Sequence, residues 1–261
     1  MPSRTVILAF IAVIGSAPLL DAQYIRIGNA EYAANNKHFG LTTMRDRHAT
    51  IHGSHVHFAF RGKSGVDHEI DFSDRRLARI VKECRDLPGQ TLFQFLDHDG
   101  NVHHIGSHDV NQYLHETVGD EFTAKDFRTW AGTILAAMAL HEYENFTSQR
   151  QARRYIVAAI ESVAKKLGNT KAVCRKCYIH PEILESYLEG ELGDFMQREG
   201  GSKAAEKAVA ALLKARSRRA AAATRRSGAE GATLVPALAR SLFHQARRLQ
   251  RSAQSVARGA S

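Results

Sequence analysis

Apolar and polar residues alternate along two neighbouring segments in the first third of the chain. The first segment runs from His55 to Phe60 and the second from Val66 to Phe72. An alternation with a period of two is typical of strands that are buried on one face. The glycines of the intervening Gly62-Lys63-Ser64-Gly65 can take the positive φ of a tight turn. The pattern therefore predicts a β-hairpin with Lys63 at or beside its tip.

Downstream of the hairpin, apolar residues recur at spacings of three and four, which indicates helices. Each of four expected helices has a suitable N-cap residue, and these are Ser73, Ser107, Thr123 and Ser148. Pro88-Gly89 would end the first helix, and Gly168 would end the last one after Leu167. The inward-facing positions are expected to be Leu77, Ile80, Val81, Cys84, Val110, Tyr113, Leu114, Phe127, Trp130, Ile134, Met138, Ile156, Ile160, Val163 and Leu167. With a short strand at 92–96, the expected fold is mainly α with a small antiparallel β-sheet (α+β).

Composition changes twice along the chain and suggests three segments. Residues 1–20 form an atypical apolar segment, residues 21–195 form the main domain, and residues 201–261 form an Ala/Arg-rich tail. The first segment has the layout of a secretory signal, with Arg4 before an apolar run that ends at Ile14. A buried helix at the start of a domain is the alternative that we favour. The low complexity of the tail predicts a flexible, partly helical extension.

Positive charge is concentrated in the tail. The whole chain carries a net charge of +9, but residues 201–261 contribute 13 Lys/Arg against 2 Asp/Glu, which leaves −2 for the remainder. The tail can therefore add salt-sensitive affinity for nucleic acid that does not depend on base sequence. Any contact made by the main domain must come from individually placed cations.

The cysteines and glycines match few generic sites. Three cysteines do not make a disulfide framework, which suits the cytoplasm. Cys174, Cys177 and His180 have a spacing that can chelate zinc, but a closed structural site needs four ligands, so we expect ordinary thiols. Gly62-Lys63 does not lie in a phosphate-binding loop of the Walker type, and nothing else in the sequence implies ATP use.

Five segments in the same order resemble the bacterial and poxvirus-type IB DNA topoisomerases. They are YIRIGNAEYA at 24–33, FGLTTMRDRH at 39–48, FRGKSG at 60–65, KDFRTWAG at 125–132 and LGNTKAVCRKCY at 167–178. The resemblance covers about residues 20 to 190. It implies the catalytic-domain fold that this family shares with tyrosine recombinases, and a DNA topoisomerase (isomerase) activity.

The resemblance also implies a set of catalytic residues. Tyr178 would attack the scissile phosphate and form a 3′-phosphotyrosyl intermediate, while Arg26 and Arg128 would grip the phosphate oxygens. Lys63 would protonate the departing 5′-oxygen. Asn169 stands where many relatives have histidine, a departure also found in bacterial members, and would donate a hydrogen bond to the phosphate.

The same resemblance sets the expected partners. The chain would relax supercoiled, double-stranded DNA by transient single-strand cleavage and religation, with no small-molecule cofactor, nucleotide or metal. We expect a monomer that does not bind membranes and is cytoplasmic, associated with the nucleoid.

Three alternatives stay open at this point. A tyrosine recombinase would share the fold and chemistry, although Lys125 stands where recombinases usually have histidine. A non-catalytic or weakly active DNA-binding remnant is the second, because the N-terminal domain with which the family closes a clamp around DNA appears to be absent ahead of Tyr24. Export by a signal peptide, with cleavage near Ala17 or Ala22, is the third.

Overall fold

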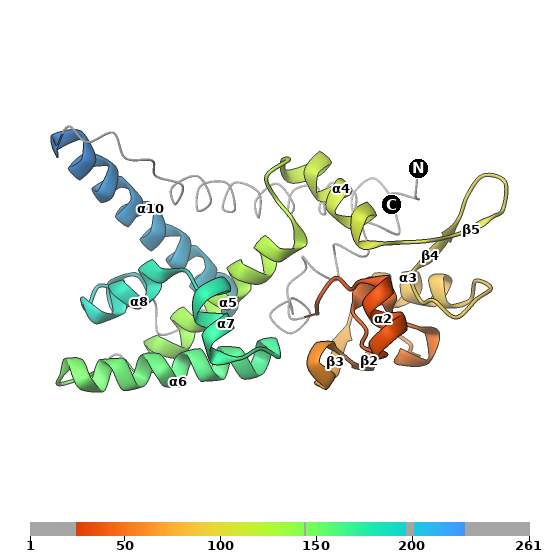
Figure 1. The fold of residues 1–261 in the computed structure, drawn as a ribbon, viewed down its shortest axis with the longest axis horizontal. Helices are drawn as coiled ribbons and strands as arrows, with labels where there is room; N and C mark the ends of the chain where they lie inside the picture. The colour runs from red at the N-terminus through yellow and green to blue at the C-terminus, as the bar shows by residue number, and fades with distance from the viewer. Residues whose placement is uncertain (1–24, 144, 197–200, 228–261) are drawn as a thin grey trace. The chain divides into compact units, whose positions relative to one another are not determined.

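The computed structural model describes residues 25–143, 145–196 and 201–227 (Figure 1). The apolar segment 1–20 lies outside the described residues. The chain divides near the start of α5 into two compact units. Unit 1 comprises the described residues up to Lys125, and unit 2 comprises those from Asp126 onward. Helices predominate and the strands form small antiparallel sheets, which confirms the expected α+β fold class.

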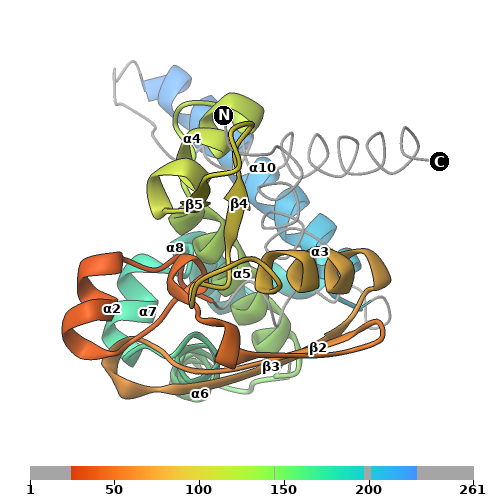
Figure 2. The same cartoon turned by 90° about the vertical axis from the view of Figure 1, so that its right-hand side faces the viewer.

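Unit 1 is built on a three-stranded antiparallel sheet with the order β1-β2-β3. The strands are β1 (Ala49–His52), β2 (His55–Arg61) and β3 (Asp67–Ser73), and Phe58 of β2 pairs with Ile70 of β3. The predicted hairpin is therefore confirmed. Helix α3 (Arg75–Arg85) packs against β2 and buries the predicted positions Leu77, Ile80, Val81 and Cys84 (Figure 2).

Two N-caps in unit 1 differ from the prediction by one residue. Ser73 is the last residue of β3 and pairs with His55, so Asp74 caps α3 and accepts the N–H groups of Arg76 and Leu77. Gly106, rather than Ser107, precedes α4 (Ser107–Val118). The N–H of Gly106 donates to the Asp109 carboxylate at 2.7 Å. In both places several polar residues compete for the cap, and the pairing of the preceding backbone decides between them.

Shorter elements complete unit 1. They are α2 (Ala30–Asn36), the 3₁₀ turns η2 (Leu41–Thr43), η3 (Asp46–His48) and η4 (Lys63–Gly65), and the strands β4 (Gln94–Leu96) and β5 (Val102–His104). Strand β5, which the sequence analysis did not predict, pairs with β4 in a two-stranded sheet. His48 packs edge-on against Phe39 at 4.5 Å between ring centroids, and burial lowers its pKa to about 4.

Unit 2 contains six helices within its described residues. They are α5 (Ala124–His141), α6 (Gln149–Leu167), α7 (Lys171–Cys177), α8 (Pro181–Leu188), α9 (Leu192–Phe195) and α10 (Gly201–Ser227). Helix α6 confirms its prediction, because Ser148 caps it and Gly168 ends it with a left-handed φ of 57°. On α5, Trp130 and Ile134 are buried as predicted, while Phe127 and Met138 are only partly buried.

The beginning of the tail differs from the flexible extension that its composition suggests. Helix α10 packs against α8 and α9, beside which it runs in Figure 1, and it buries Ala205, Val209, Leu212 and Leu213. The Arg216 guanidinium forms ion pairs with carboxylates of Glu182, Glu185, Glu189 and Glu191. Residues 201–227 are therefore folded onto unit 2. The domain boundaries expected from composition stay a prediction.

No helix in the described part of the chain is both long enough and apolar enough to cross a membrane.

Candidate active site

Arg26 lies in a loop that backbone contacts hold in place. The N–H of Leu41 donates to the Arg26 carbonyl at 2.8 Å, and the N–H and hydroxyl of Thr42 both donate to the Ile27 carbonyl, at 2.7 and 2.8 Å. A Cβ on Gly40 would lie 2.6 Å from the Arg26 carbonyl oxygen. Only glycine allows this approach. The GLTT sequence of 40–43 thus has a structural explanation: it fixes the backbone that carries Arg26.

Lys63 lies at the hairpin tip, as predicted, within η4. The turn uses positive φ at Ser64 (65°) and Gly65 (74°), whereas Gly62 is extended. Gly62 is needed for space instead, because a Cβ there would lie 2.5 Å from the His68 ring. The Lys63 ammonium is 5.8 Å from the centroid of the exposed Tyr32 ring, a cation–π distance.

One pocket in unit 1 contains both cations. It has a volume of about 570 Å³ and is lined by Arg26, the start of α2, residues 38–40 and Lys63. The N–H of Phe39 donates to the Arg61 carbonyl at 2.7 Å, next to the hairpin tip, while Gly40 and Leu41 contact the Arg26 loop. The segment 39–41 therefore joins the two cationic side chains of the predicted site.

In unit 2 the other three predicted residues cluster around the C-terminus of α6. Arg128 of α5 is 5% exposed, and its guanidinium donates to the Leu167 carbonyl. The Asn169 amide donates to the same carbonyl at 3.2 Å. The Arg128 guanidinium carbon lies 5.4 Å from the centroid of the Tyr178 ring. Because Gly168 ends α6 in the left-handed conformation, the chain turns there and brings Asn169 to this carbonyl.

Tyr178 immediately follows α7, and its backbone rests on α5. It is 8% exposed, and a Cβ on Gly132 would come within 3.0 Å of its carbonyl oxygen. The Thr129 hydroxyl donates to the Cys177 carbonyl at 3.3 Å, and the Thr133 hydroxyl accepts the His180 N–H at 3.1 Å. The α5 surface made by Thr129, Gly132 and Thr133 therefore sets the position of the tyrosine. The sequence analysis missed these three residues, although two of them lie within the KDFRTWAG segment.

Cys174, Cys177 and His180 have separate environments. Cys174 is buried within α7 and Cys177 is exposed. His180 caps α8, because its Nδ1 accepts the Glu182 N–H at 3.2 Å, and burial lowers its pKa and so favours the neutral ring that can accept. No group of three His, Cys, Asp or Glu side chains within the described ranges is placed to hold a metal ion.

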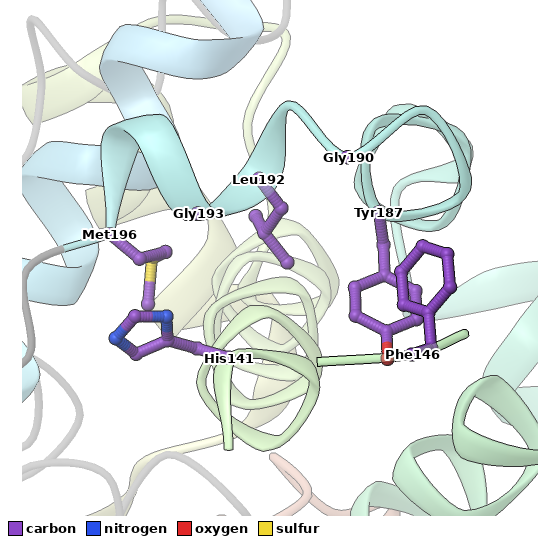
Figure 3. A pocket seen from close by; sticks show the side chains of 7 residues that line it. All are labelled: His141, Phe146, Tyr187, Gly190, Leu192, Gly193 and Met196. Carbon is purple, nitrogen blue, oxygen red and sulfur yellow. The ribbon is translucent and has the colours of Figure 1, made fainter. Parts of the chain in front are cut away.

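A second pocket lies within unit 2, away from the predicted residues (Figure 3). It has a volume of about 330 Å³, and His141, Tyr187, Leu192 and Met196 are among its lining residues. The Tyr187 hydroxyl donates to the Tyr143 carbonyl at 2.5 Å, and burial raises the pKa of that hydroxyl to about 12. Tyr187 therefore stays protonated and acts as a structural donor at neutral pH.

Comparison with known proteins assigns the family. The family described as the catalytic core of eukaryotic DNA topoisomerase I matches residues 10–199, which is well over half of the chain. The chain belongs to the type IB DNA topoisomerase family. This match confirms the resemblance drawn from the five sequence segments.

The relatives of this type IB topoisomerase chain that we compared are viral. DNA topoisomerase 1B of Acanthamoeba polyphaga mimivirus is 33% identical over 172 residues, or 62% of this chain and 51% of the relative. DNA topoisomerase I of monkeypox virus is 23% identical over 181 residues, covering 67% and 53%. DNA topoisomerase 1B of vaccinia virus strain Copenhagen is 22% identical over 178 residues, covering 67% and 53%. These relatives support the poxvirus side of the resemblance and do not support a bacterial assignment.

The chain spans about half the length of the curated relatives it matches.

Proposed function

We propose that this chain cleaves and rejoins one strand of duplex DNA and so relaxes supercoils. The observation that carries the proposal is the cluster of Arg128, Asn169 and Tyr178 around the Leu167 carbonyl, in a chain of the type IB topoisomerase family. The two units would each supply part of the site, with Arg26 and Lys63 coming from unit 1.

Tyr178 is the proposed nucleophile. Its phenolic oxygen would bond to the scissile phosphorus as the bond from phosphorus to the 5′-oxygen breaks, leaving a 3′-phosphotyrosyl link and a 5′-hydroxyl. An ordinary phenol has a pKa of about 10 and is a weak nucleophile at neutral pH, so the developing charge must be stabilised by neighbouring cations. Religation is the reverse reaction, in which the 5′-hydroxyl attacks and Tyr178 leaves.

Arg26 and Arg128 would bind the non-bridging phosphate oxygens. A guanidinium suits this task because its planar donors match phosphate geometry and its charge does not titrate away. The Leu167 carbonyl favours it by holding the Arg128 guanidinium beside the Tyr178 ring. Donors that are already oriented act on the transition state without a cost of reorganisation.

Lys63 and Asn169 have different proposed roles. Lys63 would give a proton to the departing 5′-oxygen, which would otherwise accumulate negative charge. The carboxamide of Asn169 has no such proton to give, so it would only donate a hydrogen bond to a phosphate oxygen. Its present bond to the Leu167 carbonyl, which Arg128 shares, supports a role beside the phosphate-binding arginine.

The decisive experiment is to trap and map the covalent adduct. The full chain is incubated with a nicked or truncated duplex whose cleaved 5′ fragment dissociates, and the protein–DNA adduct is digested and sequenced. Attachment of the DNA 3′ end to Tyr178 is expected, and Tyr178→Phe should bind the duplex but form no adduct. Attachment through another residue, or to a 5′ end, would overturn the proposal.

Relaxation of supercoiled plasmid tests the proposed lack of cofactors. We expect the same rate with EDTA and without nucleotide, because the proposed chemistry uses side-chain cations to stabilise charge. A reaction that EDTA stops and Mg²⁺ restores would contradict this part. Formation of a Holliday junction from paired DNA sites would instead identify a recombinase.

A further inference from the structure

We propose that Glu206 of α10 is a positioning residue for Arg128 and acts through Trp130. The inference rests on the proposed function and adds to it a residue from the basic tail. Its structural basis is one hydrogen bond: the Trp130 indole N–H donates to the Glu206 carboxylate at 3.1 Å, across 76 positions of sequence.

The indole needs this partner. Trp130 is 7% exposed, and a buried indole N–H is normally hydrogen-bonded. Removing the acceptor leaves a desolvated donor, which is costlier than losing the same bond at a surface. The environment of Trp130 is therefore most easily satisfied when α10 is docked with Glu206 in place.

Trp130 and Arg128 face opposite sides of α5. Each residue advances by about 100° around an α-helix, so Trp130 lies about 200° from Arg128. On the Arg128 side, α5 contacts the Leu167 carbonyl and, at Gly132, the backbone of Tyr178. On the Trp130 side it contacts Glu206. A helix held on two opposite sides cannot rotate about its axis without breaking one set of contacts, so Glu206 helps to set the direction of the Arg128 guanidinium.

Helix α10 is itself anchored, which allows Glu206 to act as a fixed point. Ten residues after Glu206, the Arg216 side chain is 14% exposed and pairs with carboxylates at the end of α8 and beyond it. Ten residues correspond to about 15 Å along a helix. The apolar positions Val209 and Leu212, which are buried, lie between these two polar attachments.

The test compares variants of the full chain at saturating DNA in single-turnover cleavage. Glu206→Ala is expected to slow adduct formation about tenfold, because a displacement well below 1 Å is enough to misalign a catalytic group. The affinity for DNA should stay unchanged. Glu206→Gln keeps an acceptor oxygen and should cleave within about twofold of the parent chain. Lys207→Ala, at the exposed neighbouring position, is the matched control and should have no effect.

A double-variant cycle separates positioning from general stability. In an Arg128→Ala background, Glu206→Ala should cause no further loss, because the group that it positions is already gone. A purely structural role would instead lower the melting temperature and add its effect in either background. Trp130 is the only tryptophan in the chain, so its fluorescence reports the same bond directly. Its emission should change in Glu206→Ala and not in Glu206→Gln.

The outcomes are distinguishable. If the parent chain forms no Tyr178 adduct, the proposed function fails and this inference fails with it. If the parent chain cleaves DNA and Glu206→Ala cleaves at the same rate, only the inference is overturned. Equal defects in the Ala and Gln variants, or an additive loss on Arg128→Ala, would overturn it as well.

Discussion

Replacing Gly40 by alanine is expected to damage the proposed site without removing any functional group. The added Cβ would lie 2.6 Å from three backbone atoms, which are the Arg26 carbonyl oxygen and the nitrogen and Cα of Gly28. Ordinary van der Waals contact begins at 3.4 Å, so these backbones must separate by most of an ångström. Gly40 has an extended φ of −137°, which alanine adopts without strain, so the clash is the only cause.

The size of the effect follows from what the separation disturbs. Overpacking of this kind costs about 1–3 kcal/mol of unfolding free energy. Moving the Arg26 backbone also stretches the bond from the Leu41 N–H, which is now 2.8 Å long. A misplacement of this size in a catalytic group can cost about 100-fold in rate. We therefore expect a modest loss of stability and a much larger loss of cleavage rate at saturating DNA.

Urea unfolding and single-turnover cleavage measure the two effects on the same variant. Gly106→Ala is the matched control, because Gly106 is in the same unit, has a φ of −96°, and offers the new Cβ a contact no closer than 3.4 Å. It should leave the cleavage rate unchanged. The explanation is refuted if Gly40→Ala cleaves as fast as the parent chain, or if Gly106→Ala is equally impaired.

Three further predictions concern Lys63, the tail and His48. Lys63→Ala should cleave normal DNA slowly but recover on a 5′-bridging phosphorothiolate, whose thiolate leaves without a proton; equal defects on both substrates would make Lys63 a simple phosphate contact. Ending the chain after Ser227 removes five arginines and one glutamate, so it should weaken DNA binding and reduce the salt slope by about 0.9 per lost phosphate contact, with cleavage at saturation unchanged; ending it after Met196 should also lower the melting temperature, and an unchanged melting temperature would mean that α10 adds no stability. Because burial lowers the pKa of His48 from 6.5 to about 4, the unfolded chain binds more protons between these values; unfolding free energy should therefore fall as the pH drops through this window, and less so in His48→Gln, whereas equal pH dependence in both would exclude His48 as the cause.

Local sequence patterns predicted most of the regular elements of the fold. The strands on either side of Lys63 alternate, and helix α6 has both a capping serine and a terminating glycine, so each is specified by neighbouring residues. Strand β5 has only three residues, Val-His-His, and no alternation to detect. Its pairing with β4 depends on a partner rather than on its own composition.

The docking of α10 illustrates what sequence patterns could not show. Its alanines and arginines read as low complexity, and the inward-facing Val209 and Leu212 are too few to stand out. The partners of Arg216 are glutamates 25 to 34 positions earlier, which only the folded chain brings near. For the candidate site, the resemblance supplied the five side chains. It did not supply the shared Leu167 carbonyl or the glycines that make room for the backbone.

The ion pairs of α10 also alter how the charge of the tail should be counted. Glu182, Glu185, Glu189 and Glu191 would by themselves form an acidic surface that repels a DNA backbone. Arg216 and Arg219 supply counter-charge to this surface. Two of the 13 basic residues beyond residue 200 are therefore engaged inside the protein. The formal +11 of the tail overstates the charge that it presents to phosphate, and part of its value to a DNA-binding protein is the repulsion that it removes.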